Sequence, residues 1–230
     1  MNPALAVVAI VVASGAVVCV SARTTRPAFG GLALTLVAAS FLADPLPDGL
    51  ALGARVVAAM LAVYLPWIVV RGRATITRGS LLGWPVEALV AAAAFVIGFG
   101  TAGLGAGGLG PAEAQAVGFA LVAVAVGPLV FGRDLFRLGA GGILLVLGVG
   151  LVRVSLGGTP GGLEEVVTGS VLIGLGAALA FLLSSAAAAG VADGDVLAEP
   201  LPIAAATIRD IDPLATRSGA SRRGAGRGSR

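Results

Sequence analysis

Residues 114–132 read AQAVGFALVAVAVGPLVFG and contain no charged side chain. At about 1.5 Å per residue, a helix of this length approaches the roughly 30 Å thickness of the hydrocarbon core of a bilayer. Six further windows are also long and mainly apolar, at 3–21, 28–43, 50–70, 82–102, 138–154 and 166–190, and the second of them is the shortest. The sequence therefore predicts an all-α, polytopic transmembrane bundle of about seven helices.

The composition of the whole chain agrees with a membrane environment. Of 230 residues 57% are apolar and only 12% are charged, and the mean hydropathy is +1.02, so too little polar surface exists to coat a soluble globule. We expect residues 1–190 to form one transmembrane domain in contact with membrane lipid. Residues 191–230 mix acids and Arg with Ala, Gly and Ser, which predicts a largely disordered, Arg-rich tail.

The residues that the chain lacks narrow its chemistry. It has no His and a single Cys, Cys19, so the usual ligands of zinc, haem and iron-sulfur clusters are missing. Catalysis by a Ser-His-Asp or Cys-His arrangement is excluded for the same reason. An enzyme acting on lipid would need a polar cluster at one interface, and the sequence alone shows no pattern that predicts one. We expect no metal, no cofactor, no catalytic residues and no catalytic activity of the chain's own.

The distribution of Arg predicts an orientation. Cytoplasmic loops retain positive charge, and seven Arg lie in the connections after the first, third and fifth windows, whereas the other connections hold five acids, with Arg55 and Arg153 at helix ends. The N-terminus is therefore expected outside and the C-terminus in the cytoplasm of a prokaryotic cell. A cleaved signal sequence at 3–21 is the alternative for the first window, but positive charge follows this window instead of preceding it.

Two further features concern the cytoplasmic side. Tyr64, Trp67 and Trp84 fall at helix ends, where amphipathic rings favour the headgroup layer. The basic tail is expected to meet anionic lipid, and because no aromatic residues are interleaved with its Arg, we expect no binding of nucleic acid.

Glu87, Arg55 and Arg153 are the candidates for an ion pathway or a subunit interface. Glu87 lies five residues into its window and is either a proton site or a carboxylate that caps a helix N-terminus. Arg55 and Arg153 either snorkel to water from a helix end or line an outer vestibule and pair with a carboxylate of another subunit. Pro66 and Pro128 predict kinks within the third and fifth windows.

Residues 133–141, which read RDLFRLGAG, carry a recognisable pattern. Arg133, Arg137 and Gly141 are spaced as in the cytoplasmic turn of a group of membrane subunits, and Asp134 stands where that group usually has Asn. The pattern resembles the subunit K family of NADH-quinone oxidoreductase, the C subunit of Mrp-type cation antiporters and component E of hydrogenase-4. Component E matches best, because its length, its helix number and its charge alternation are similar across the full chain, and residues 208–214, IRDIDPL, are similar to its ending.

The resemblance implies a membrane subunit of a complex I-like respiratory or hydrogenase assembly, with antiporter-like subunits as partners. In the K subunits membrane-embedded glutamates take part in proton transfer, and the first would fall near Ile143, which carries no proton. No acid lies deep within 166–190 either. We therefore expect a non-catalytic subunit that packs against its partners. The alternative is a self-contained small transporter or permease that uses Glu87 and the proline-kinked helices.

Overall fold

Seven α-helices account for almost all of the chain that the structure describes. This computed structural model describes residues 2–43, 46–71, 83–102, 110–132, 134–158 and 161–188, and it has no strand in these ranges. The helices are α1 Pro3–Ser21, α2 Thr25–Ala39, α3 Gly49–Val70, α4 Trp84–Thr101, α5 Ala112–Phe131, α6 Leu135–Gly157 and α7 Gly162–Ala188. All except α2 are long and apolar enough to cross a membrane. The expected all-α membrane bundle is confirmed, whereas the expected tail at 191–230 lies outside the described residues.

The second helix is the short one, as its window predicts. α2 has 15 residues, which at about 1.5 Å per residue is shorter than a hydrocarbon core. The chain continues for one tighter turn, in which the amides of Phe41 and Leu42 donate to the carbonyls of Ala38 and Ala39, each at 3.1 Å. Leu32 and Leu36 are almost fully buried. The middle of α2 is therefore packed inside the bundle.

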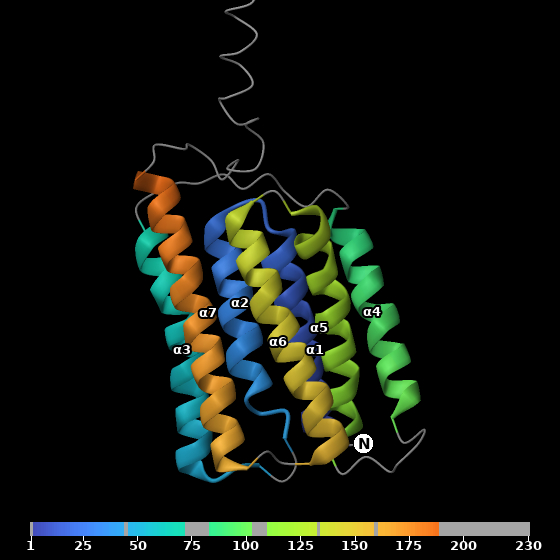
Figure 1. Cartoon of the computed structure of the whole chain (residues 1–230). Helices are drawn as coiled ribbons and strands as arrows, with labels where there is room; N and C mark the ends of the chain where they lie inside the picture. Colours follow the sequence, from blue (N-terminus) through green and yellow to red (C-terminus); the bar gives the residue numbers. More distant parts are fainter. Residues whose placement is uncertain are drawn as a thin grey trace, which may run out of the picture. The chain divides into compact units, whose positions relative to one another are not determined.

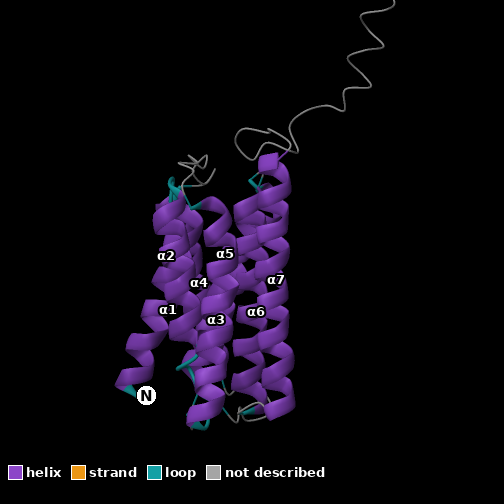
Figure 2. Cartoon of the chain, turned by 90° about the vertical axis from the view of Figure 1, so that its left-hand side faces the viewer, coloured by secondary structure: helices purple, strands orange, loops and turns teal. Residues whose placement is uncertain are grey.

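Successive helices run antiparallel, and α5 lies among the others (Figure 1). α5 packs against α6, α4 and α1, whereas α3 packs against α7 and α2. In the view of Figure 1, α3 and α7 lie side by side at one edge and α4 lies at the opposite edge. The turned view of Figure 2 shows the same near-parallel alignment of the helix axes. This arrangement gives α5 the most complete cover and leaves one face of α4 and of α7 exposed.

Glycine lets the helix backbones approach closely at each main contact. Where α1 crosses α2, a Cβ added to Gly31 would lie 2.6 Å from the carbonyl oxygen of Gly15. The hydroxyl of Thr35 donates to the carbonyl of Gly31 at 2.8 Å, so this buried polar group is satisfied within its own helix. Because lipid tails are as apolar as side chains, such close packing is a main source of helix association in a bilayer.

The contact between α5 and α6 has the same character over a longer stretch. A Cβ on Gly118 would lie 2.7 Å from the carbonyl oxygen of Gly148, and a Cβ on Gly148 would lie 2.9 Å from that of Gly118. Nearer the other end of the two helices, a Cβ on Gly141 would lie 3.2 Å from the side chain of Pro128. Pro66 and Pro128 both lie inside continuous helices.

The predicted aromatic boundary is only partly a surface feature. Tyr64 and Trp84 are 55% and 67% exposed, as rings in a headgroup layer would be. Trp67 instead packs against the buried ring of Phe29, with centroids 5.5 Å apart in an edge-on geometry, and Phe29 also contacts Phe136 at 4.6 Å. Phe29 of α2 therefore contacts aromatic rings of both α3 and α6.

We predict opposite effects from two Gly→Ala substitutions in α5. Gly118→Ala would force a methyl group against Gly148 and the side chain of Val152, and we expect a loss of about 1–3 kcal/mol of stability. In Gly127→Ala the added methyl group has no neighbour within 4 Å, and the higher helix propensity of Ala is expected to stabilise by up to about 1 kcal/mol. Thermal unfolding in one detergent compares the two variants. Equal effects would show that close approach at Gly118 is unimportant.

Candidate functional site

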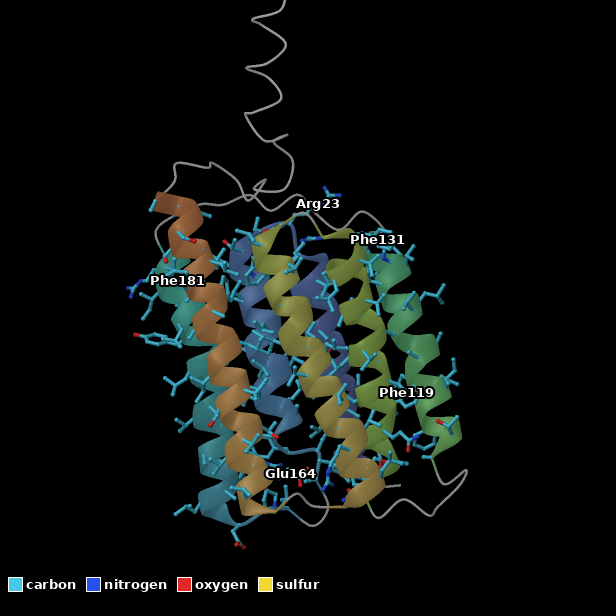
Figure 3. The ribbon with its side chains drawn as sticks, viewed as in Figure 1. Arg23, Phe119, Phe131, Glu164 and Phe181 are labelled. Atoms are coloured by element: carbon cyan, nitrogen blue, oxygen red, sulfur yellow. The ribbon has the colours of Figure 1, made fainter. Side chains whose placement is uncertain are left out.

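The charged residues of the described helices gather at the two ends of the bundle. Arg23 and Glu164 mark these ends in Figure 3, and we call them the Arg23 end and the Glu164 end. At the Arg23 end α1, α3, α5 and α7 finish and α2, α4 and α6 begin, and at the Glu164 end the reverse holds. The connections that are rich in Arg therefore lie at one end of the bundle and those that are rich in acids at the other. Which end faces the cytoplasm stays a prediction.

At the Glu164 end, Arg55 of α3 forms an ion pair with Glu165 of α7. The Nη2 of Arg55 donates to Oε1 of Glu165 at 2.8 Å. The side chains are 21% and 10% exposed, so water screens this pair only weakly. The Glu165 carboxylate is therefore the partner of Arg55 in this chain, and it reaches Arg55 because α3 and α7 pack side by side.

Arg153 of α6 pairs with Glu164, the residue that precedes Glu165. Its Nη2 donates to Oε2 at 2.8 Å, and its Nε contacts Oε1, which is the bidentate geometry of a guanidinium on a carboxylate. The side chains are 46% and 38% exposed, so solvent screens this pair more than the pair of Arg55.

The two ion pairs together fix the N-terminus of α7 between two other helices. Glu164 and Glu165 are adjacent in the sequence and reach α6 and α3 respectively. Both carboxylates also lie in the first helical turn of α7, where the dipole of the helix favours negative charge. The sequence places both acids in one connection and both Arg at helix ends, but only the helix packing assigns the partners.

A second polar cluster at the Glu164 end joins α4, α5 and α6. The amide of Gln115 donates to the Thr101 hydroxyl, and the Ser155 hydroxyl donates to Oε1 of Gln115, each at 3.2 Å. The backbone amide of Gly110 donates to the carbonyl of Ser155 at 3.0 Å. Sequence reasoning missed this cluster, because uncharged polar residues on three separate helices give no local pattern.

At the Arg23 end, the residues of the 133–141 pattern hold α6 to its neighbours. Asp134 caps α6 by accepting from the amide of Phe136 at 3.0 Å. The Nη2 of Arg137 donates to the carbonyl of Ala22, just after α1, at 3.1 Å. Arg137 is 93% buried, although its position after a helix suggested an exposed loop charge, because its side chain turns inward to α1. Gly141 permits the contact with Pro128, and Arg133 lies outside the described residues.

Glu87 is buried in the first turn of α4, after Pro85. This position at a helix N-terminus is the one that the capping interpretation requires, although it does not distinguish a structural from a proton-binding carboxylate. Glu87 lies at the Arg23 end, so the structure does not bring it together with Arg55 or Arg153. Ile143 is fully buried on α6.

Comparison with known proteins gives this chain no relative: no family model, no curated protein and no solved structure matches it.

The two ion pairs are predicted to differ in their contribution to stability. Glu165→Gln leaves the part-buried guanidinium of Arg55 without its counter-charge, and we expect a loss of about 1–3 kcal/mol. Glu164→Gln removes the more exposed pair and should change stability by at most about 1 kcal/mol. Thermal unfolding in detergent measures both.

The double variant Arg55→Gln/Glu165→Gln is the control for this comparison. It should recover much of the loss seen in Glu165→Gln, because no unpaired charge remains. Additive losses in the double variant would contradict direct pairing.

Proposed function

We propose that the chain is a non-catalytic integral membrane subunit of a complex I-like respiratory or hydrogenase assembly in the prokaryotic cytoplasmic membrane. In this proposal it packs against antiporter-like subunits and does not carry ions itself. The observation that carries the proposal is the charge-free middle of the bundle. Every charged residue of the described helices lies within seven residues of a helix end, Arg55 being the deepest.

An ion carrier needs ionisable groups at depth, because an ion without a partner in hydrocarbon is strongly destabilised. The middle of α5 instead meets α6 through the backbone contact of Gly118 and Gly148. Glycine on α4 and α7 makes two further close contacts, since a Cβ on Gly98 would lie 2.9 Å from the Cα of Ala116, and one on Gly176 would lie 2.7 Å from that of Ala62. Such packing suits a subunit that holds its neighbours in position.

The outer face of α7 supports packing against another subunit. Ser170, Gly174 and Ala178 share one side of α7 and are exposed, and a Cβ on Gly174 would have no neighbour within 4 Å. Elsewhere the exposed surface carries bulky apolar side chains, such as Leu89 and Val96 of α4, each more than two-thirds exposed. Small residues allow close approach of a partner helix, whereas bulky ones suit lipid.

The resemblance of residues 133–141 to the K, C and component E subunits names the class of assembly. Within this chain, Asp134 caps the start of α6 and Arg137 links α6 to the residue that follows α1. Gly141 allows α6 to approach α5. Their roles are structural, as the proposed function requires.

The proposal predicts that the tagged chain, extracted from its native membrane in mild detergent, co-purifies with a large antiporter-like subunit identified by mass spectrometry. Gly174→Leu should reduce this recovery severalfold, because the added side chain occupies the face offered to the partner helix. Gly100→Leu on α4 is the matched control, since Gly100 also has no neighbour within 4 Å, and it should leave recovery unchanged. A stable chain recovered without such a partner would contradict the proposal.

Liposomes holding the purified chain alone, with a pH-sensitive dye inside, test the alternative. The proposal predicts no ion-dependent signal above that of empty liposomes. A flux that Glu87→Gln abolishes would favour a self-contained transporter instead.

A further inference from the structure

Arg26 of α2 and Arg71, the residue that follows α3, lie at the same level on neighbouring helices. α2 packs against α3, and the ring of Phe29 meets that of Trp67 with centroids 5.5 Å apart. Arg26 precedes Phe29 by three residues and Arg71 follows Trp67 by four, which at about 1.5 Å per residue is about one helical turn in each case. Because α2 begins and α3 ends at the Arg23 end, both Arg lie one turn outward from the ring contact.

Both Arg lie on the outer side of the boundary between α2 and α3. Gly30 is exposed and follows Arg26 by one turn, and a Cβ added to Gly30 would have no neighbour within 4 Å. On α3, the amide of Arg71 donates to the carbonyl of Trp67 at 2.8 Å, so Arg71 keeps a helical position. It therefore shares one side of α3 with Tyr64, which is 55% exposed.

No acid of the described residues pairs with these two charges. Both Arg are exposed, and neither guanidinium forms an ion pair or a hydrogen bond with a described residue. The described acids at this end are Glu87, on a helix that does not pack against α2 or α3, and Asp134, which contacts Arg137. Two neighbouring cations repel each other, so an anion shared between them is stabilising.

The start of α2 adds to this preference for an anion. Arg26 lies in the first turn of α2, where the helix dipole favours negative charge. Thr24, at the cap position, makes no side-chain hydrogen bond to this turn. The charge of the two Arg and the dipole of α2 therefore act in the same direction.

Apolar surface continues from the two Arg toward the middle of the bundle. Leu34 follows Gly30 by one further turn of α2 and is 48% exposed. On α3, Met60 is 52% exposed and precedes Tyr64 by one turn. Two cations at the outer edge of an apolar surface complement a molecule that joins an anionic headgroup to hydrocarbon chains, whereas a free phosphate ion would use the cations alone.

We propose that Arg26 and Arg71 form a binding site for an anionic phospholipid. The phosphate lies between the two guanidinium groups, which match its oxygens with paired N–H donors, and an acyl chain lies along Gly30 and Leu34. A phosphatidylcholine carries a cationic group that the two Arg repel, so the site selects lipids with net negative charge. The site uses neither α4 nor α7, so the inference is independent of the proposed function.

Quenching of Trp67 fluorescence by brominated lipids tests the site. Trp84→Phe leaves Trp67 as the only Trp of the chain, about one turn from both Arg. The purified full-length Trp84→Phe chain is placed in vesicles of phosphatidylglycerol and phosphatidylcholine, with bromine on the acyl chains of one lipid or the other. We expect phosphatidylglycerol to occupy the position beside Trp67 severalfold more often than phosphatidylcholine at equal mole fractions. Equal quenching by the two lipids would overturn the proposal.

Three Arg variants in the Trp84→Phe background locate the preference. Arg26→Gln and Arg71→Gln should each reduce it severalfold. Arg23→Gln is the matched control and should retain it, because it removes the same charge from the same end, but Arg23 extends beyond the helix ends (Figure 3). An equal loss in Arg23→Gln would show a general attraction of anionic lipid to a positive surface and would also overturn the proposal. The comparison of the two lipids does not depend on the folding of these variants.

Discussion

The close approach of α5 to α6 at Gly118 and Gly148 is the contact on which the rest of the bundle depends. α5 is covered by α1, α4 and α6, and its backbone meets that of α6 without intervening side chains. In a bilayer, burial of apolar surface does not favour one helix over lipid, so geometric fit decides which helices associate. A side chain at either glycine would separate the two helices. Thr101, Gln115 and Ser155, which link α4, α5 and α6, would then lose their hydrogen bonds.

The second constraint is the exclusion of charge from hydrocarbon. It places the ionisable residues near helix ends and makes pairing valuable for those that are partly buried. Glu164 and Glu165 meet this constraint by binding Arg153 and Arg55, and they thereby hold α7 to α6 and α3. Arg137 meets it at the opposite end through the carbonyl of Ala22. Charges that look like loop residues in the sequence therefore act as links between helices.

The helices could be predicted from the sequence because hydropathy and length are local properties. The window 3–21 coincides with α1, and the others differ from their helices by a few residues at each end. The partners of Arg55 and Arg153 could not be predicted, since they depend on which helices are neighbours. The signal that comes nearest is the Glu164 and Glu165 doublet, located on the same side as the two Arg. The packing of Trp67 on Phe29 and the burial of Glu113 could not be predicted for the same reason, because both depend on which helices are neighbours.

The central claim is that the middle of α5 is dry and packed, as in a subunit that positions others. Single cysteines along its inner face, introduced in a Cys19→Ala background and exposed to a charged, water-soluble thiol reagent in proteoliposomes, test it most directly. Cysteines replacing Val117, Leu121 and Val124 should be unreactive, whereas one replacing the exposed Asp48 should react. Reaction along the whole inner face of α5 would reveal an aqueous pathway through the bundle and contradict the account.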